Sequence, residues 1–155
     1  MPYLVDGHNL IPKLGLRLDS LDDEEQLISR LQEFCRLRRA QVEVFFDGAP
    51  PGHAATRKAG TLTAHFIRQG STADTAIENR LSRLGKSARN WTVVSSDGRV
   101  QSAGRAVHAS VLSSEEFSRE ISKVLAIGST HLKNAATLAP GEVEEWLDIF
   151  SQKRD

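Results

Sequence analysis

Near its start the chain reads Tyr-Leu-Val-Asp-Gly-His-Asn over residues 3–9, an apolar run that closes on an aspartate and a glycine. Three later segments also place an aspartate where a strand-like run ends or a helix begins: Phe46-Asp47-Gly48, Thr72-Ala73-Asp74 and Ser96-Asp97-Gly98. In a parallel α/β sheet the carboxyl ends of the strands lie along one edge, so acids at those ends converge on one crevice. The recurrence therefore predicts an α/β fold with four carboxylates at one sheet edge.

The length and composition indicate a single soluble domain. A chain of 155 residues is long enough to bury about two thirds of the surface that its unfolded form exposes. No apolar run approaches the ~20 residues of a membrane span, and the first residues lack the features of a signal peptide. The single cysteine, Cys35, forms no internal disulfide. We therefore expect a cytoplasmic protein with no membrane partner.

Apolar spacing predicts strands that alternate with helices. The expected strands cover residues 2–6, 42–46, 62–67, 91–95 and 107–109, and the expected helices cover residues 20–39, 71–84, 97–104, 113–125 and 141–151. Residues 49–60 are rich in Gly and Pro and are expected to form a loop. Strands separated by helices of this size predict a three-layer α/β/α sandwich with a mostly parallel central sheet.

The carboxyl-terminal region is expected to lie outside this domain. We place the domain at residues 1–128, followed at 129–155 by a linker and the last amphipathic helix. That helix either packs on its own domain or pairs with a second subunit to form a homodimer.

Charge is unevenly distributed although the formal net charge is zero. Residues 51–108 carry nine Lys or Arg and three Asp or Glu, whereas the flanking thirds are acidic. A basic middle third predicts a surface that binds phosphates, and the alternative is that each arginine is merely solvated on a helix face.

The four aspartates predict a metal site. Carboxylates that share one site repel each other, and hard divalent cations with oxygen ligands relieve that repulsion. Glu78 lies one helical turn after Asp74 and is expected to face the same site. Each acid also has a structural alternative: a turn for Asp6 and Asp47, a helix first turn for Asp74, a helix N-cap for Asp97 and an arginine partner for Glu78.

The combination of these segments resembles the NYN domains of the PIN-like nuclease superfamily, and within them the bacterial YacP-like group. The matching pieces are residues 4–11, 44–48, 71–74 with 77–78, and 93–97 with Gln101 and Gly104, which together span roughly residues 2–120. Two positions depart from the pattern: His8 stands where the group more often has tyrosine, and residues 70–72 lack the acidic residue often found before Ala73-Asp74.

The resemblance implies a PIN-like sandwich, a cluster of acids that holds Mg²⁺ or Mn²⁺, and RNA endonuclease activity, in some members on or near the ribosome. Position by position it points to Asp6, Asn9, Asp47, Asp74 and Asp97.

From these residues we predict a metal-dependent endoribonuclease that hydrolyses phosphodiester bonds in line. The expected catalytic acids and metal ligands are Asp6, Asp47, Asp74 and Asp97, with Glu78 as a further ligand, and the expected substrate-binding residues are Asn9, Ser96, Arg57, Lys58 and Arg99. The alternative is a catalytically inactive PIN-like module that binds RNA or the ribosome.

Overall fold

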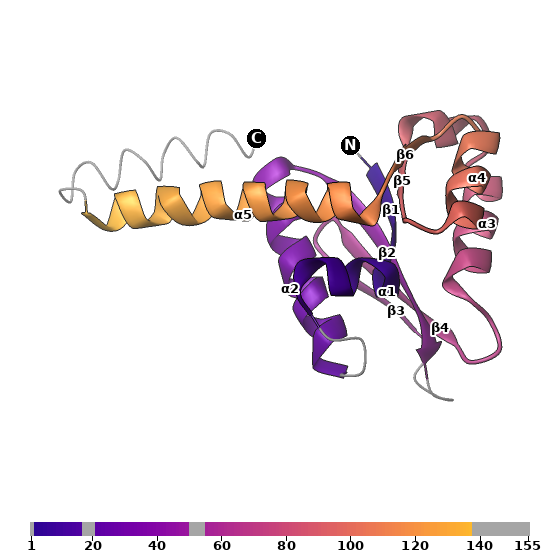
Figure 1. The fold of residues 1–155 in the computed structure, drawn as a ribbon, viewed down its shortest axis with the longest axis horizontal. Helices are drawn as coiled ribbons and strands as arrows, with labels where there is room; N and C mark the ends of the chain where they lie inside the picture. The colour runs from indigo at the N-terminus through magenta and orange to yellow at the C-terminus, as the bar shows by residue number, and fades with distance from the viewer. Residues whose placement is uncertain (1, 17–20, 50–54, 138–155) are drawn as a thin grey trace.

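The described part of the chain forms one sheet between two layers of helices. A computed structural model describes residues 2–16, 21–49 and 55–137 (Figure 1). The sheet has six strands in the order β3-β4-β2-β1-β5-β6. These strands are β1 (Pro2–Asp6), β2 (Gln41–Ala49), β3 (Ala55–Ala59), β4 (Leu62–Arg68), β5 (Thr92–Val94) and β6 (Ser110–Leu112). All neighbours are parallel except β3, which runs antiparallel to β4 at one edge.

Two groups of helices cover the two faces of this sheet. One layer holds α1 (Gly7–Leu10), the 3-10 turn η1 (Ile11–Leu14), α2 (Leu21–Arg38) and α5 (Ser114–Thr137). The other holds α3 (Ala73–Leu84), the 3-10 segment η2 (Gly85–Asn90) and α4 (Gly98–Ala106). Figure 1 shows the two layers on opposite sides of the strands. The fold is therefore a three-layer α/β/α sandwich with a mostly parallel sheet, as predicted.

Each layer has its own apolar core because successive strand side chains point to opposite faces. In β1, Leu4 packs with the core under α3 and α4, whereas Val5 packs with the core under α2 and α5. Both residues are fully buried. A central strand covered on both faces accounts for the unbroken apolar run that the sequence shows here.

Local contacts explain why the elements begin where they do. The Thr72 hydroxyl accepts a hydrogen bond from the Thr75 amide at 3.1 Å and caps α3, and the Asp97 carboxylate accepts one from the Arg99 amide at 2.8 Å and caps α4. At the β1–α1 junction Gly7 has no room for a side chain, because an added Cβ would lie 2.4 Å from Cε1 of Phe46. A close approach, and not an unusual backbone angle, requires glycine at this position.

Several predicted boundaries differ from the structure. Residues 55–59, expected in a loop, form the edge strand β3, and the last strand lies at 110–112 and not at 107–109. The turns at residues 7–14 were not predicted. Helix α5 runs to Thr137, so residues 129–137 are helical where a linker was expected. The helix predicted at 141–151 lies outside the described residues, and the domain boundary at 128 stays a prediction.

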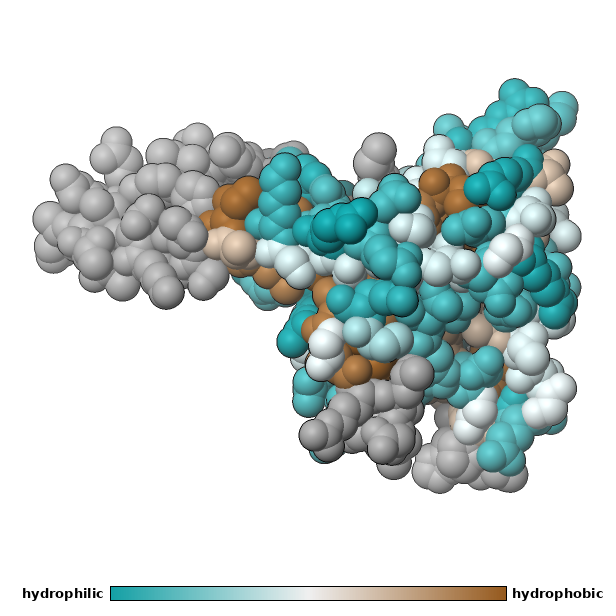
Figure 2. Space-filling model, in the orientation of Figure 1, coloured by the Kyte–Doolittle hydropathy of each residue, from teal (hydrophilic) through white to brown (hydrophobic). Residues whose placement is uncertain are grey.

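The visible surface of this body is mostly hydrophilic. In Figure 2 the brown, hydrophobic atoms gather mainly along α5 and over α2. Ile127 on α5 is a large apolar side chain that is 51% exposed. Among the described residues, no helix is both long and apolar enough to cross a membrane.

Candidate active site at the carboxyl edge of the sheet

The ends of β1, β2 and β5 create the candidate site. Strand β1 lies between β2 and β5. The chain places β2 and β4 on one side of β1 and later places β5 and β6 on the other side, so the direction of strand addition reverses at β1. Such a reversal leaves a crevice at the carboxyl edge of an α/β sheet. Asp6 is the last residue of β1, Asp47 lies near the end of β2, and Ser95 directly follows β5. The four predicted aspartates are therefore placed around this edge, together with the amino-terminal ends of α3 and α4.

Asp6 is the buried acid of the site. Its side chain lies at the junction of β1 and α1, and the residue is 7% exposed. Burial is the main reason that the pKa of Asp6 is raised to about 6, and the negative charges of Asp74 and Asp47 contribute to this rise, whereas a hydrogen bond from Ser95 opposes it. No described residue forms an ion pair with Asp6. Its carboxylate is thus a negative charge that the described residues leave uncompensated.

Asp74 connects the other acids electrostatically. It lies in the first turn of α3, and its pKa is raised first by burial and then by the charge of Asp97. Asp47 and Glu78 raise this pKa as well, whereas the Arg99 guanidinium lowers it. The repulsion shows that the acids predicted from separate segments lie within interaction distance of each other.

Asp47 and Asp97 are partly engaged by neighbouring groups. Asp47 accepts a hydrogen bond at Oδ1 from Nδ1 of His8 at 2.8 Å, and its Oδ2 lies 3.5 Å from the Ala73 amide. Asp97 uses Oδ1 to cap α4. The N-cap alternative for Asp97 is therefore confirmed, and its role as a metal ligand stays a prediction. The second oxygen of Asp97 has no hydrogen-bond partner among the described residues.

Ser95 joins two of these acids from the end of β5. Its hydroxyl donates to Oδ2 of Asp6 at 3.3 Å and accepts from the Asp97 amide at 3.0 Å. Ser95 is fully buried, and its two hydrogen bonds link the end of β1 to the start of α4. Its place directly before Ser96-Asp97 was visible in the sequence, but its contact with Asp6 was not.

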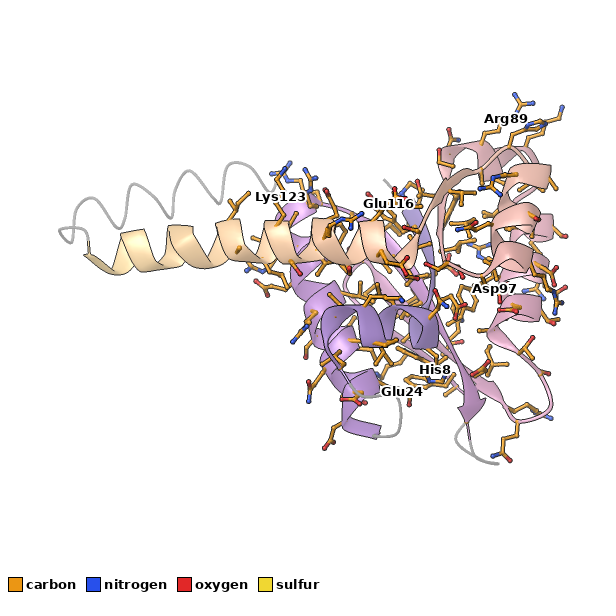
Figure 3. The ribbon with its side chains drawn as sticks, viewed as in Figure 1. His8, Glu24, Arg89, Asp97, Glu116 and Lys123 are labelled. Carbon is orange, nitrogen blue, oxygen red and sulfur yellow. The ribbon has the colours of Figure 1, made fainter. Side chains whose placement is uncertain are left out.

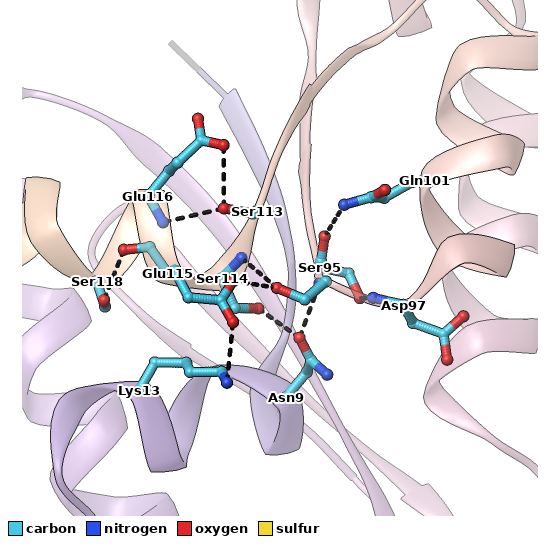
Figure 4. A network of polar contacts seen from close by, with 11 residues as sticks. Asn9, Lys13, Ser95, Asp97, Gln101, Ser113, Ser114, Glu115, Glu116 and Ser118 are labelled. Carbon is cyan, nitrogen blue, oxygen red and sulfur yellow. Dashed lines mark hydrogen bonds and ion pairs between the residues drawn. The ribbon is translucent and has the colours of Figure 1, made fainter.

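Asn9 and Ser96, predicted to bind substrate, belong to a polar network that anchors α5 (Figure 4). Oδ1 of Asn9 accepts from the Ser96 amide at 2.8 Å and from the Ser114 hydroxyl at 2.5 Å. The Ser96 hydroxyl donates to Glu115 at 2.5 Å, and Glu115 also pairs with Lys13 at 2.9 Å. A backbone N–H can only donate, so its contact fixes Oδ1 as the acceptor and leaves the Asn9 Nδ2 without a described partner.

The predicted basic ligands are mostly paired with acids. Arg57 binds Glu25 through two hydrogen bonds of 3.0 and 2.8 Å, and Arg99 binds Glu78 at 2.6 Å. The arginine partner considered for Glu78 is thus present, and its role as a metal ligand stays a prediction. Lys58 is exposed on β3 and forms no ion pair with a described residue.

Other cations of the basic middle third lie at the opposite edge of the sheet. Strand β5 runs from η2 toward Asp97, so η2 lies at the amino edge of the parallel strands. Figure 3 shows Arg89 at the far end of this layer, away from Asp97. Four exposed cations lie at this edge without an ion pair to any described residue, and we call them the far-edge basic surface: Arg83, Lys86, Arg89 and Arg105.

The donor chemistry suits a hard divalent ion, although the side chains do not converge in this conformation. The four carboxylates form an oxygen-rich, negatively charged edge, in which the pKa values of Asp6 and Asp74 are raised by burial and by neighbouring acids. Within the described ranges, no three His, Cys, Asp or Glu side chains meet closely enough to hold one ion. Convergence on one ion would require side-chain rotation, for which Asp97 still has an oxygen without a hydrogen-bond partner among the described residues.

Two residues of this neighbourhood were not predicted as site residues. His8 lies between Asp47 and Glu24, and its Nε2 is 2.7 Å from Oε2 of Glu24. The hydrogen bond to Glu24 raises the pKa of His8 above its usual value, and burial opposes the rise. His8 lies within the matching segment 4–11, where it replaces the more usual tyrosine. No spacing rule connects Glu24 with it, because Glu24 belongs to the first turn of α2.

Comparison with known proteins identifies relatives of this arrangement. A family model described as "YacP-like NYN domain" matches residues 3–148. The crystal structure of Rae1 (YacP) from Bacillus subtilis is 25% identical with a TM-score of 0.74, and the match covers 99% of this chain and 94% of that one. A mutant of that protein gives the same identity and TM-score over 94% of this chain and 89% of that one. No curated protein matches the chain.

Proposed function

The chain belongs to the YacP-like NYN domain family, and from this membership and the site geometry we propose that it is a metal-dependent endoribonuclease. The family is one of nucleases. The observation that carries the proposal is the uncompensated charge of Asp6, whose pKa is raised to about 6 by burial and by the neighbouring acids. At neutral pH such a group is mostly ionised, and a cation beside it would offset the cost of its buried charge.

In the proposed site, Mg²⁺ or Mn²⁺ is held by Asp6, Asp47, Asp74 and Asp97. When bound, a divalent ion lowers the pKa of a water and offsets the negative charge that grows on the phosphate oxygens. Asp6 is the rigid member of the set because it is buried at a strand end, and the other three flank it from β2, α3 and α4. Glu78 is the proposed outer ligand, released from Arg99 when the cluster rearranges.

The chain's own polar groups position the RNA. Nδ2 of Asn9 has two N–H donors without a described partner, and the orientation of this amide is fixed by Ser96 and Ser114. We therefore assign Asn9 a direct contact with a phosphate oxygen, and Ser96 the role of orienting Asn9. Arg57, Lys58 and Arg99 are the proposed cations for the RNA backbone. Of these, Arg99 lies beside the acids, whereas Lys58 pairs with Thr63 in the sheet and lies nearer the amino end of the parallel strands.

The far-edge basic surface provides a second contact for the RNA backbone. Arg83 lies nine residues after Asp74 on the same helix, about 14 Å along its axis at 1.5 Å per residue. RNA that reaches both places therefore spans several nucleotides. Backbone contacts of this kind predict binding that weakens steeply with salt and has little sequence preference. The proposed partner is RNA, free or within the ribosome, in the cytoplasm.

The experiment compares wild-type protein with Asp6→Asn and Asp97→Asn on single-stranded and structured RNA, with Mn²⁺ or with EDTA. We expect cleavage by the wild type only with Mn²⁺, and loss of cleavage with retained RNA binding in both variants. Cleavage that persists in EDTA, or in Asp6→Asn, would contradict the proposed site.

The second candidate function is a catalytically inactive RNA- or ribosome-binding module. It is favoured by the lack of a converged ligand set among the described side chains. An inactive module binds RNA equally with Mn²⁺ and with EDTA and shows no metal-dependent cleavage. The same experiment therefore separates the two functions. A homodimer through residues 141–151 remains a proposal, and sedimentation of the full chain tests it.

A further inference from the structure

The His8 side chain connects three elements beside the candidate site. Nε2 contacts Oε2 of Glu24 on α2 at 2.7 Å, and Nδ1 contacts Oδ1 of Asp47 on β2 at 2.8 Å. The ring also packs against Phe46, with centroids 5.5 Å apart. Figure 3 shows His8 and Glu24 next to each other, on α1 and at the start of α2.

Both ring nitrogens face carboxylate oxygens, and these contacts define the orientation of the ring. An ionised carboxylate can only accept hydrogen bonds, so His8 donates in both directions. Glu24 fixes one side of the ring, and the other side then holds Oδ1 of Asp47. The remaining oxygen, Oδ2, is left on the side of α3, 3.5 Å from the Ala73 amide. This is also the side of Asp74, whose pKa the Asp47 charge raises.

We propose that Glu24 and His8 are positioning residues that hold Asp47 in the orientation in which Oδ2, the oxygen that His8 does not bind, faces the other acids. Neither residue contacts substrate or the reacting atoms in this proposal. It rests on the proposed function, because it assigns a purpose to the orientation of Asp47. It adds Glu24, an acid outside the strand-end pattern, to the residues on which metal binding depends.

Magnitudes argue for positioning over stabilisation of the fold. The side chains of His8 and Asp47 are 30% and 41% exposed. Pairs with this much solvent contact stabilise a protein by about 0–1 kcal/mol. In contrast, groups that orient a metal ligand typically change metal affinity or activity by about 10–100-fold when removed. A chain of two short hydrogen bonds that ends on a candidate ligand fits the second effect.

The experiment uses Glu24→Ala, the conservative Glu24→Gln and the control Glu33→Ala in the full chain. Glu33 lies on the same helix and is exposed, with its ion pair directed to Arg36. Mn²⁺ affinity is measured by calorimetric titration, and RNA cleavage is measured as a function of Mn²⁺ concentration. Thermal unfolding in EDTA reports whether each variant is folded.

We expect Glu24→Ala to bind Mn²⁺ about 10–100-fold more weakly and to need correspondingly more Mn²⁺ for half-maximal cleavage. The cleavage rate at saturating Mn²⁺ should change much less, because Asp47 is still present. Glu24→Gln should recover most of the affinity, since its amide oxygen still accepts from Nε2 of His8. Glu33→Ala should match the wild type.

The possible failures are distinguishable. If the wild type binds Mn²⁺ and Glu24→Ala binds it equally well, the positioning role is overturned and the proposed nuclease is not. If Glu33→Ala loses as much affinity as Glu24→Ala, the effect is general electrostatics, and the positioning role is again overturned. If the wild type neither binds Mn²⁺ nor cleaves RNA, both proposals fall together.

Discussion

Replacing Asp6 by asparagine should stabilise the metal-free protein while it abolishes cleavage. Asparagine has nearly the same shape and can still accept the hydrogen bond from the Ser95 hydroxyl, but it carries no charge. The wild-type carboxylate is buried among other acids and has no cationic partner among the described residues. The substitution therefore removes a repulsion that the folded metal-free state contains and the unfolded state does not.

The magnitude follows from the shift in pKa. Burial, Asp74 and Asp47 move the pKa of Asp6 from 3.8 to about 6 in the folded protein. Each unit corresponds to about 1.4 kcal/mol, so ionised Asp6 destabilises the fold by roughly 3 kcal/mol at neutral pH. For a chain of this size that corresponds to a rise in Tm of roughly 6–12 °C in the variant.

The sign of the pH dependence is defined by the same shift. Because the folded pKa is higher than the unfolded one, the penalty is absent below pH 3.8, grows as the pH rises and is complete above about pH 6. The advantage of Asp6→Asn should therefore fall from roughly 3 kcal/mol at pH 7.5 to about 1 kcal/mol at pH 4.5.

Urea unfolding of both proteins in EDTA at these two pH values measures the difference in the free energy of unfolding. Glu33→Gln, at an exposed position on α2, is the matched control and should not show this pH-dependent gain. Added Mn²⁺ should raise the stability of the wild type and not that of Asp6→Asn, because only the former holds the ion. The reasoning is refuted if Asp6→Asn is no more stable than the wild type at pH 7.5, or if its advantage is equally large at pH 4.5.

Three further predictions test the packing, the buried ion pairs and the far-edge basic surface. Gly7→Ala should lower the free energy of unfolding by about 1–3 kcal/mol, because the new methyl group overlaps the Phe46 ring. Gly98→Ala is the control, since an added Cβ there has no atom within 4 Å, and thermal unfolding compares the two variants. Glu43→Gln should lower the free energy of unfolding by roughly 3 kcal/mol at pH 7 and by little near pH 2, since the folded pKa of Glu43 is lowered to about 2. If the two proteins still differ as much in stability near pH 2 as at pH 7, this prediction is contradicted. Lys86→Glu should weaken RNA binding, measured by fluorescence anisotropy, and should reduce the salt dependence of that binding. Cleavage at saturating RNA should not change. An unchanged RNA affinity would exclude the far-edge basic surface as a contact for RNA.

The parts of the site that follow strand ends were predictable from sequence. An apolar run that stops at an aspartate locates the carboxyl end of a strand, and parallel strands bring those ends together whatever separates them in the chain. This places Asp6 and Asp47 correctly. Asp74 and Asp97 were located by helix-start signals, which the caps at Thr72 and Asp97 confirm. Their roles in catalysis remain predictions.

Other features depended on tertiary contacts that no local pattern encodes. Residues 55–59 carry breakers on their amino-terminal side, yet they form a strand because β4 offers a free edge. Arg57 was predicted to bind substrate from its charge, but its guanidinium meets Glu25 on α2, which a sequence pattern does not reveal. The contact between His8 and Glu24 was hidden in the same way, since it depends on how α1 packs against α2.

A comparison of the two buried acids of the sheet explains why Asp6 in particular indicates an external cation. Glu43 on β2 is also buried, which by itself raises its pKa, but hydrogen bonds from His65 and Arg80 outweigh burial and lower the pKa to about 2. The fold therefore supplies partners for one carboxylate within the chain. One strand away, Asp6 is surrounded by further acids instead, and its pKa rises to about 6. An ion pair of the Glu43 kind at Asp6 would remove a penalty of roughly 3 kcal/mol, a large part of the total stability of a domain. The proposed cation from solution would supply the partner that Asp6 lacks among the described residues. The expected stabilisation of the wild type, but not of Asp6→Asn, by Mn²⁺ tests this proposal directly.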